Sequence, residues 1–347
     1  MNSNLPKLSF ASDYMEGAHP LILQRLLETN MLKTAGYGLD EFSHAARQKI
    51  RRACQTPDAD IFFLTGGTQT NAIIIGALLK PYQGVIAAAS GHISIHEAGA
   101  IEAGGHKVLA LPHRNGKLSA EAIEAYIRSY WQDENREHMV MPGLVYISQP
   151  TEYGTLYSLE ELEQISAVCR SSQIPLYLDG ARLAYALACP ENDATLPDLA
   201  RLCTAFYIGG TKCGALFGEA AVIPKQNCIP HLFTIIKQQG ALLAKGRIAG
   251  LQFDTLFSEG LYFRIGHNAI DAARRIRQAL LERGYKLAFP SPTNQIFIEF
   301  EDSKLKTISS QIELSYWEKS DETHTIMRLA TSWATSAEDV EALLSII

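Results

Sequence analysis

The stretch DIFFLTGGTQTNAIIIGALL, residues 60–79, joins an apolar run to a glycine turn and then to a second apolar segment of helical length. The run at 60–64 is apolar on both faces, which is typical of a strand in a parallel sheet. After the turn at 66–68 we expect a helix to begin near Gln69. Glycines let backbone N–H groups approach an anion, and a helix N-terminus favours negative charge. The stretch therefore predicts a strand–turn–helix unit with a phosphate cradle.

The glycine turn matches neither of two common nucleotide-binding motifs. No lysine follows it, as GxxxxGK[ST] requires, and the third glycine of GxGxxG is missing. A group with one phosphate is therefore favoured over a nucleoside triphosphate or a dinucleotide. The alternative is an ordinary turn between strand and helix, in which the glycines serve only the backbone geometry.

Further apolar runs, separated by segments of helical length, predict the other parallel strands of an α/β sheet. They lie at 85–89, 107–111, 143–148, 175–179 and 205–209. Helix starts are predicted between them, with a capping box formed by Ser158 and Glu161 and an N-cap at Ser119.

The pattern changes after about residue 240. The segment LYFRIGHNAIDAARRIRQALLERG repeats apolar residues at helical spacing and stops at Gly284, a residue suited to the position just after a helix. The segment TNQIFIEF at 293–300 is strand-like, and Ser336 with Asp339 predicts the start of a last helix. We expect a large domain with a mostly parallel sheet and a smaller α+β C-terminal domain.

The expected boundary divides the chain into residues 1–245, an N-terminal arm with the large domain, and residues 246–347.

The 347 residues carry a formal net charge of −6 and show no basic patch for nucleic acid. We find no signal peptide and no apolar run of about 20 residues, so we expect no membrane partner and a cytoplasmic location. The six cysteines form no CxxC pair, which argues against a disulfide framework or a zinc ribbon, and no residue is assigned to a metal.

Two of the predicted strand ends carry ionisable groups, and ligands of open parallel sheets bind at such ends. Asp179 ends the run 175–179, where a carboxylate needs a positive or hydrogen-bonding neighbour to stay ionised. The alternatives for it are a salt bridge to Arg182 or an N-cap. Lys212 follows the run 205–209 among glycines, and burial there would lower its pKa and favour Schiff-base formation. The alternative is a lysine whose ammonium simply reaches water.

A phosphate cradle, an acid and a lysine together meet the demands of pyridoxal 5′-phosphate, whose phosphate, ring nitrogen and aldehyde each need a partner. The segments GGTQTN, SGHISIHEAGAIEAGG, LDGARL and GGTKCGAL occur in this order. In this set the chain resembles the low-specificity L-threonine aldolases, which belong to the β-eliminating lyases of the aspartate-aminotransferase-like fold. FASDYMEGAHP, GYG at 36–38 and MRLATSWATSAEDVEALL also fit, so the resemblance covers nearly the whole chain.

The resemblance implies a cofactor site. Lys212 would be the Schiff-base lysine, and Asp179 the partner of the pyridine nitrogen. Gly67 and Thr68 would hold the phosphate. His92 would stack on the ring and take part in proton transfer, since imidazole offers both an aromatic face and a titratable nitrogen.

The resemblance also implies how the substrate is held. Arg182 and Arg328 would pair with the α-carboxylate of an amino acid, with Arg182 also part of the cofactor site, because a guanidinium matches a carboxylate in shape and charge. Ser12 would add a hydrogen bond. Arg247 would reach the cofactor phosphate of a neighbouring subunit, which implies a homodimer or homotetramer with shared active sites.

One segment departs from the family. Threonine aldolases typically carry Asn-Thr-His after the strand predicted at 143–148, whereas this chain reads SQPTEYGTLY and offers Gln149, Thr151 or Glu152. The implied reaction is retro-aldol cleavage of a threonine-like β-hydroxy-α-amino acid to glycine and an aldehyde. The departure leaves open β-elimination or transamination of another amino acid. A third possibility is a protein that binds the cofactor without turnover.

Overall fold

The computed structural model describes residues 7–347. Its largest sheet has seven strands in the order β2-β8-β7-β6-β5-β3-β4. These strands are β2 (Asp60–Leu64), β3 (Gln83–Ala88), β4 (Val108–Leu111), β5 (Met141–Ser148), β6 (Leu176–Asp179), β7 (Ala205–Gly209) and β8 (Glu219–Ile223). All six predicted strands are present, with ends that differ from the prediction by at most two residues.

Strand β8 is the member of this sheet that the sequence pattern did not predict. It pairs antiparallel with β7 and with β2, whereas the pairs β3–β4, β3–β5, β5–β6 and β6–β7 are parallel. Residues 210–218 alone join β7 to β8, and so short a connection can only return the chain antiparallel. Lys212 lies in this return, at the carboxyl end of β7.

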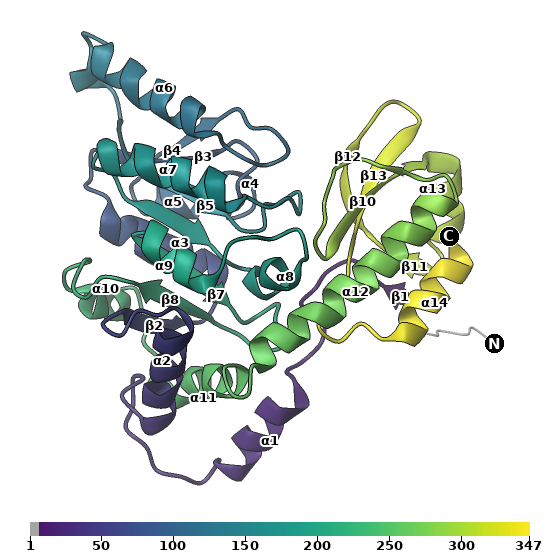
Figure 1. The fold of residues 1–347 in the computed structure, drawn as a ribbon, viewed down its shortest axis with the longest axis horizontal. Coiled ribbons are helices and arrows are strands. Elements are labelled where there is room, and N and C mark those ends of the chain that lie inside the picture. Colours follow the sequence, from purple (N-terminus) through teal and green to yellow (C-terminus); the bar gives the residue numbers. More distant parts are fainter. Residues whose placement is uncertain (1–6) are drawn as a thin grey trace.

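Helices cover both faces of the large sheet (Figure 1). The buried cluster on one face includes side chains of α2, α6, α7, α8 and α9, and the cluster on the other includes those of α3, α5 and α10. Their bounds are α2 (Glu41–Ala53), α3 (Gly67–Leu78), α4 (His92–Ile95), α5 (Ala100–Ala103), α6 (Ala120–Gln132), α7 (Leu159–Ser171), α8 (Leu183–Ala188), α9 (Leu196–Leu202) and α10 (Leu232–Gln238). A 3₁₀ turn, η1 (Arg136–His138), precedes β5.

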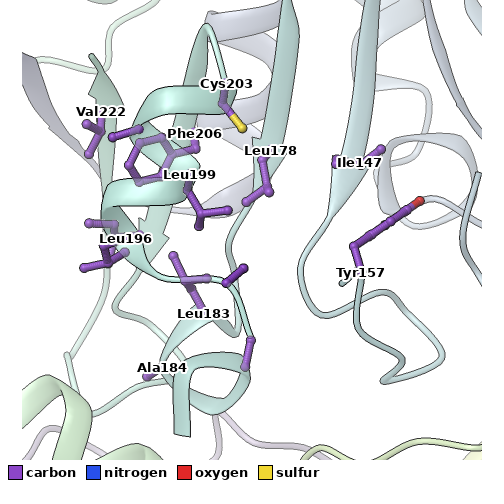
Figure 2. Packing of buried hydrophobic residues seen from close by; sticks show 14 of the residues in the cluster. Ile147, Tyr157, Leu178, Leu183, Ala184, Leu196, Leu199, Cys203, Phe206 and Val222 are labelled. Atoms are coloured by element: carbon purple, nitrogen blue, oxygen red, sulfur yellow. The ribbon is translucent and has the colours of Figure 1, made fainter. Parts of the chain in front are cut away.

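The alternation of side chains along the strands divides the core into two layers. Ile147, Leu178 and Phe206 point to one face, where they pack with helix residues such as Leu183 and Leu199 (Figure 2). Their neighbours Tyr146, Tyr177 and Tyr207 belong to the cluster on the α3 side and are almost fully buried. The sheet is therefore buried on both faces, as its apolar runs predicted, and one face carries three tyrosine hydroxyls.

The C-terminal part forms a four-stranded antiparallel sheet in the order β12-β13-β10-β9. Helices α12 and α14 share a buried core with this sheet that includes Ile276, Leu280, Ile298, Leu329 and Leu343. The bounds are β9 (Lys286–Leu287), β10 (Gln295–Glu301), β12 (Ser315–Lys319), β13 (His324–Ala330), α12 (Leu261–Glu282), α13 (Asp302–Ile308) and α14 (Ala337–Ile346).

The predicted helix signals are confirmed. Both capping boxes form, at Ser158 with Glu161 and at Ser336 with Asp339, and Ser119 caps α6. Gly284 follows α12 with a φ of +78°, a left-handed conformation that favours glycine. No helix in residues 7–347 combines the length and the apolarity needed to cross a bilayer.

The N-terminal arm connects the two parts of the molecule. Strand β1 (Leu8–Ser9) pairs in parallel with β11 (Ile312–Glu313), near the C-terminal sheet. The chain then crosses to α1 (Pro20–Glu28), which packs on α11 (Arg247–Leu256), and α11 in turn packs on α2 (Figure 1). The division of the chain after residue 245 stays a prediction.

Candidate active site

Two adjoining cavities lie at the carboxyl ends of the large sheet's strands. The first, of about 290 Å³, is lined by residues that include Gly67, Thr68, His92, Asp179 and Lys212. The second, of about 280 Å³, shares His92 and Lys212 with the first and extends to Arg328 of β13. Arg182 lines both. The structure thus brings most of the predicted site residues together at the junction of the two parts of the chain.

A larger cavity, of about 590 Å³, lies near Arg114 and Pro290 and contains none of the predicted residues. Its lysine, Lys117, is paired with Glu161 at 2.6 Å. We therefore place the candidate site in the two smaller cavities.

Asp179 is buried at the end of β6 and is surrounded by hydrogen-bond donors. Its Oδ2 accepts from the Tyr146 hydroxyl at 2.7 Å and from Asn71 Nδ2 of α3 at 3.0 Å. Oδ1 accepts from the backbone N–H of Ala181 at 3.0 Å, and Tyr207 adds a further hydrogen bond. The two-residue period of a strand explains the arrangement, because it places Asp179 on the same face as the tyrosine of β6 and its neighbours.

These donors decide the charge of Asp179. Burial alone would raise its pKa, but the nearby His92 and the hydrogen bonds from Tyr207, Tyr146 and Asn71 outweigh burial and lower the pKa below its usual value. Asp179 is therefore an ionised carboxylate inside the protein. The alternative of a salt bridge to Arg182 is wrong because Arg182 pairs elsewhere, and helix α8 begins only at Leu183.

A chain of hydrogen bonds links Asp179 to His92. Asn71 donates to both Asp179 and Glu97 Oε1, the latter at 2.7 Å, and Tyr177 donates to Asn71 Oδ1 at 2.9 Å. Glu97 Oε1 lies 2.7 Å from His92 Nδ1, at the start of α4. This contact fixes the imidazole and leaves its Nε2 for a ligand.

The start of α3 provides the expected anion site. The helix begins at Gly67, two residues before the predicted Gln69, and no side chain caps it at Gly66. A Cβ added at Gly66 would meet no atom within 4 Å, so open space borders this backbone. The first N–H groups of the helix lack helical partners and lie at the cavity with Thr68, where they can bind an anion.

Lys212 is half-buried and lines both cavities. Burial lowers its pKa, and the positive charge of Arg182 lowers it further, although Asp13, Asp179 and Glu219 act in the opposite direction. The lowered pKa confirms the sequence expectation for this lysine and favours a nucleophilic amine.

Glu219, the first residue of β8, is a second buried acid beside Lys212. It accepts hydrogen bonds from Gly210 N at 3.1 Å and from Thr211 Oγ1 at 2.9 Å. Burial raises its pKa to about 8, even though these bonds and Lys212 act to lower it. Glu219 was not predicted as a site residue, because the strand that carries it, β8, was not predicted either.

Arg182 has a protein partner. Its Nε and Nη2 donate to the two oxygens of Asp13 at 2.6 and 3.0 Å, and Asn294 Nδ2 donates to the same carboxylate at 2.9 Å. Asp13 is fully buried; although burial would raise its pKa, Arg182, Lys212 and Asn294 lower it to about 2. The arm, the large sheet and the C-terminal part meet at this ion pair.

Arg328 lies at the far end of the second cavity. It donates to Gln295 Oε1 at 3.3 Å, to Ala11 O at 3.2 Å and to Ser315 Oγ at 3.2 Å. Its Nε, like Ser12 Oγ in the adjacent arm, is buried and has no hydrogen-bond partner within residues 7–347. Unpaired buried polar groups are costly, so the Arg328 Nε beside the second cavity is consistent with a polar ligand, whereas Ser12 lines neither cavity.

Arg247 is not brought into either cavity. It is the first residue of α11, donates to Thr29 Oγ1 at 2.5 Å and to Leu32 O at 3.2 Å, and stacks over Phe42. Its predicted contact with a neighbouring subunit stays a prediction.

The segment that departs from the family places one of its three candidates at the site. Gln149 bonds the backbone of Tyr157, at 3.0 Å as donor and 2.9 Å as acceptor, and Thr151 bonds Thr155 at 2.6 Å. Glu152 instead lines both cavities.

Several residues of the site were not predicted from the sequence. Asp13, Asn71 and Glu97 reach it from segments far apart in the chain, and His96 and Trp317 line the second cavity. His96 could have been found, because it lies one helical turn after His92 in GHISIHEAG.

The residues present fit pyridoxal 5′-phosphate. The first cavity is lined by the ionised Asp179, by Lys212 with its lowered pKa, and by the uncapped start of α3. Its volume of about 290 Å³ is near the lower limit for pockets that bind small molecules. Asp179, Lys212 and the start of α3 match the three groups of the cofactor that need partners.

Comparison with known proteins agrees with this site. The model of the beta-eliminating lyase family matches residues 9–302. The solved structure of a threonine aldolase of Leishmania major is 43% identical, covers 97% of this chain and 98% of its own, and superimposes with a TM-score of 0.94. The low specificity L-threonine aldolase of Pseudomonas aeruginosa is 29% identical over 87% of each chain. Aspartate aminotransferase of Thermus thermophilus, 16% identical over 98% of this chain and 92% of its own, shares the fold with a TM-score of 0.72. The chain is a member of the beta-eliminating lyase family and, within it, of the threonine aldolases.

Proposed function

We propose that this protein is a pyridoxal phosphate-dependent lyase that cleaves threonine-like β-hydroxy-α-amino acids to glycine and an aldehyde. The observation that carries the proposal is that Asp179, a buried ionised carboxylate, and Lys212, an amine of lowered pKa, line the same cavity. When bound, the cofactor supplies a ring that accepts electrons from a bond at the substrate α-carbon.

The residues would divide the tasks of holding the cofactor. Asp179 would keep the ring nitrogen protonated, since an ionised acceptor without competing water favours a bound proton. Gly67 and Thr68 would bind the phosphate at the start of α3. Lys212 would bind the aldehyde, and its lowered pKa leaves more of the amine unprotonated for that purpose. His92, fixed by Glu97, would cover the ring.

The second cavity would hold the amino acid. Arg328 and Ser12 would bind the α-carboxylate, a role supported by the unpaired Arg328 Nε and Ser12 Oγ. Arg182 is already bound to Asp13, so we assign it mainly to shaping the site and to lowering the pKa of Lys212.

A first experiment tests the cofactor. The purified protein should be yellow, and borohydride should fix the cofactor covalently on Lys212, as peptide mass spectrometry can show. The Lys212→Ala variant should not be labelled. A colourless protein, or labelling that persists in Lys212→Ala, would refute the cofactor assignment.

A second experiment tests the reaction. Incubation with threonine, phenylserine and serine should release an aldehyde and glycine, detected separately from keto acid and ammonia. If keto acid and ammonia are the only products, the protein is a β-eliminating enzyme or an aminotransferase and the aldolase proposal is wrong.

We also infer that the protein forms a homodimer or homotetramer. Apolar side chains on and after α1 are strongly exposed, with Leu27 at 79%, Met31 at 87% and Leu39 at 68%, and a second copy of the chain would bury them. Arg247 lies beside this surface and would reach the partner's cofactor phosphate. Light scattering should give a dimer or larger, and a monomer at micromolar concentration would contradict the inference.

Two further assignments remain proposals of the same kind. The six free cysteines, five of them buried, support a cytoplasmic location, since thiols stay reduced there. The C-terminal sheet with its own core supports a separate smaller domain. The predicted boundary after residue 245 lies before α11, which packs on α2 and shares the core of the large sheet.

A further inference from the structure

The structure assigns Glu152 as the residue that accepts the β-hydroxyl proton of the substrate, an inference that rests on the proposed lyase function. Retro-aldol cleavage needs such a base, because the hydroxyl must lose its proton as the carbonyl of the aldehyde forms.

The position of the substrate follows from where its α-carbon and its carboxylate must bind. Its α-carbon must lie near Lys212, where the cofactor is bound, and its carboxylate near Arg328 in the second cavity. The side chain on the α-carbon therefore lies close to the residues common to both cavities, which are Tyr14, His92, Glu152, Arg182 and Lys212.

Among these shared residues, Glu152 is suited to accept a proton. Arg182 is a permanent cation paired with Asp13, and Lys212 is assigned to the cofactor. Glu152 is the carboxylate that borders the second cavity within the described part of the chain, since Asp179 and Glu219 line only the first. Tyr14 offers a phenol hydroxyl, which is a much weaker proton acceptor than a carboxylate. The imidazole of His92 is held by Glu97 at 2.7 Å.

The carboxyl group of Glu152 is held in one orientation. Its Oε1 accepts from the backbone N–H of His92 at 2.9 Å and from Ser148 Oγ at 2.7 Å. The other oxygen, Oε2, makes no hydrogen bond to another residue within residues 7–347, and Glu152 lines both cavities. One oxygen therefore fixes the group and the other is free for a substrate hydroxyl.

The surroundings also tune Glu152 for proton transfer. Burial raises its pKa above the usual value, and the charge of Asp179 raises it further, although Ser148 and His92 act in the opposite direction. A carboxylate with a raised pKa is the stronger base, and its pKa lies nearer to neutral pH.

The hydroxyl proton moves to Glu152 Oε2, and the O–H electron pair becomes the second bond of the aldehyde carbonyl. The bond between Cα and Cβ breaks and its electron pair stays with Cα, a change for which the cofactor held by Lys212 and Asp179 would supply an electron-accepting ring. A proton then joins Cα to give glycine, and Glu152 releases its proton to solvent, so that the amino acid yields only glycine and the aldehyde.

Glu152→Gln is the direct test, because glutamine keeps the shape and the Oε1 acceptor but removes the carboxylate. Threonine cleavage should fall about 100-fold or more, the usual contribution of a general base. Exchange of the glycine α-proton in D₂O, which needs the cofactor but breaks no carbon bond, should stay within about threefold of wild type. Cofactor absorbance, borohydride labelling of Lys212 and the Kd for glycine should be unchanged, and Glu152→Asp should recover part of the cleavage rate.

Tyr153→Phe is the matched control in the same turn. Its ring packs edge-on against Phe289 and Trp317, and this variant keeps that packing while removing only a hydroxyl. It should cleave threonine at the wild-type rate.

Each other outcome overturns the assignment in its own way. Unchanged cleavage in Glu152→Gln would transfer the role to His92. Parallel loss of cleavage, glycine exchange and cofactor binding would make Glu152 a structural support for the backbone of His92. Failure of the wild type itself to bind the cofactor or to release an aldehyde would refute the proposed function, and the assignment of Glu152 with it.

Discussion

Replacing Asp13 by asparagine should destabilise the protein strongly, because this change leaves the Arg182 guanidinium without its carboxylate. Both side chains are removed from water, with 12% of the Arg182 side chain and none of Asp13 exposed. Asparagine has the same shape as aspartate but no charge. The expected loss is therefore the loss of the ion pair itself.

The structure sets the magnitude. The pKa of Asp13 falls from 3.8 to about 2, which corresponds to about 2 kcal/mol of stabilisation at ~1.4 kcal/mol for each pKa unit. The unpaired buried guanidinium adds to this loss, and breaking one side of a buried ion pair costs about 3–5 kcal/mol in total. Since the folded pKa is depressed, this stabilisation is present above pH 3.8 and disappears as the pH falls through 2.

The assay is urea denaturation of the cofactor-free protein at pH 7, followed by circular dichroism. The control is Glu163→Gln, which breaks an arginine–carboxylate pair with Arg201 at 2.8 Å whose side chains are 53% and 47% exposed. That change should cost less than about 1 kcal/mol. The double variant Asp13→Asn with Arg182→Met should be more stable than Asp13→Asn, because it also removes the uncompensated charge.

A loss no larger than that of Glu163→Gln would refute the reasoning. The reasoning would also be refuted if the double variant had a lower free energy of unfolding than Asp13→Asn, by as much as an independent Arg182→Met substitution would cost. The first result would mean that the ion pair does not hold the arm in solution, and the second that Arg182 stabilises the fold through other contacts.

Three further changes test the site. Asp179→Asn should lower kcat at least about 30-fold with the cofactor still bound, since a charge-assisted hydrogen bond contributes about 2 kcal/mol or more; steady-state rates at measured cofactor occupancy check this, and an unchanged kcat would contradict the role. Arg328→Leu should raise KM about 100-fold, since the carboxylate loses its paired contact; a change in kcat alone would place Arg328 elsewhere in the mechanism. Glu219→Gln should change how the stability of the cofactor-free protein depends on pH. Burial raises the pKa of Glu219 to about 8, so the wild type loses stability as the pH rises from about 4.5 through 8 and the variant should not; parallel denaturation midpoints from pH 5 to 9 would contradict this.

The sequence predicted the parts of this molecule that depend on local patterns. Six strands, the glycine turn before α3 and the stop of helix α12 ahead of Gly284 all follow from apolar periodicity and backbone preference within a short window. Strand β8 was not predicted, because its sequence EAAVI follows a glycine-rich loop and begins with a charged residue, so its apolar run is short.

Residues of the site could be predicted only where the residues next to them in the sequence indicated their chemical role. Lys212 and Asp179 stand out because each interrupts an apolar run. The partners of Asp179 could not be identified in this way, because Asn71 and Tyr146 lie 108 and 33 residues away in the chain. The ion pair of Arg182 could not be predicted for the same reason, since Asp13, its partner at a separation of 169 residues, becomes its neighbour only in the folded chain. The contact of Arg182 with substrate stays a prediction.

The parallel pairing of β1 with β11 has a consequence for synthesis on the ribosome. Residues 8–9 leave the ribosome about 300 residues before the residues that they pair with, 312–313. At about 5–20 residues per second, the large sheet has time to fold while the arm waits unpaired. Asp13, in the same arm, accepts a hydrogen bond from Asn294, so this carboxylate gains its full set of partners only after the C-terminal part has been made.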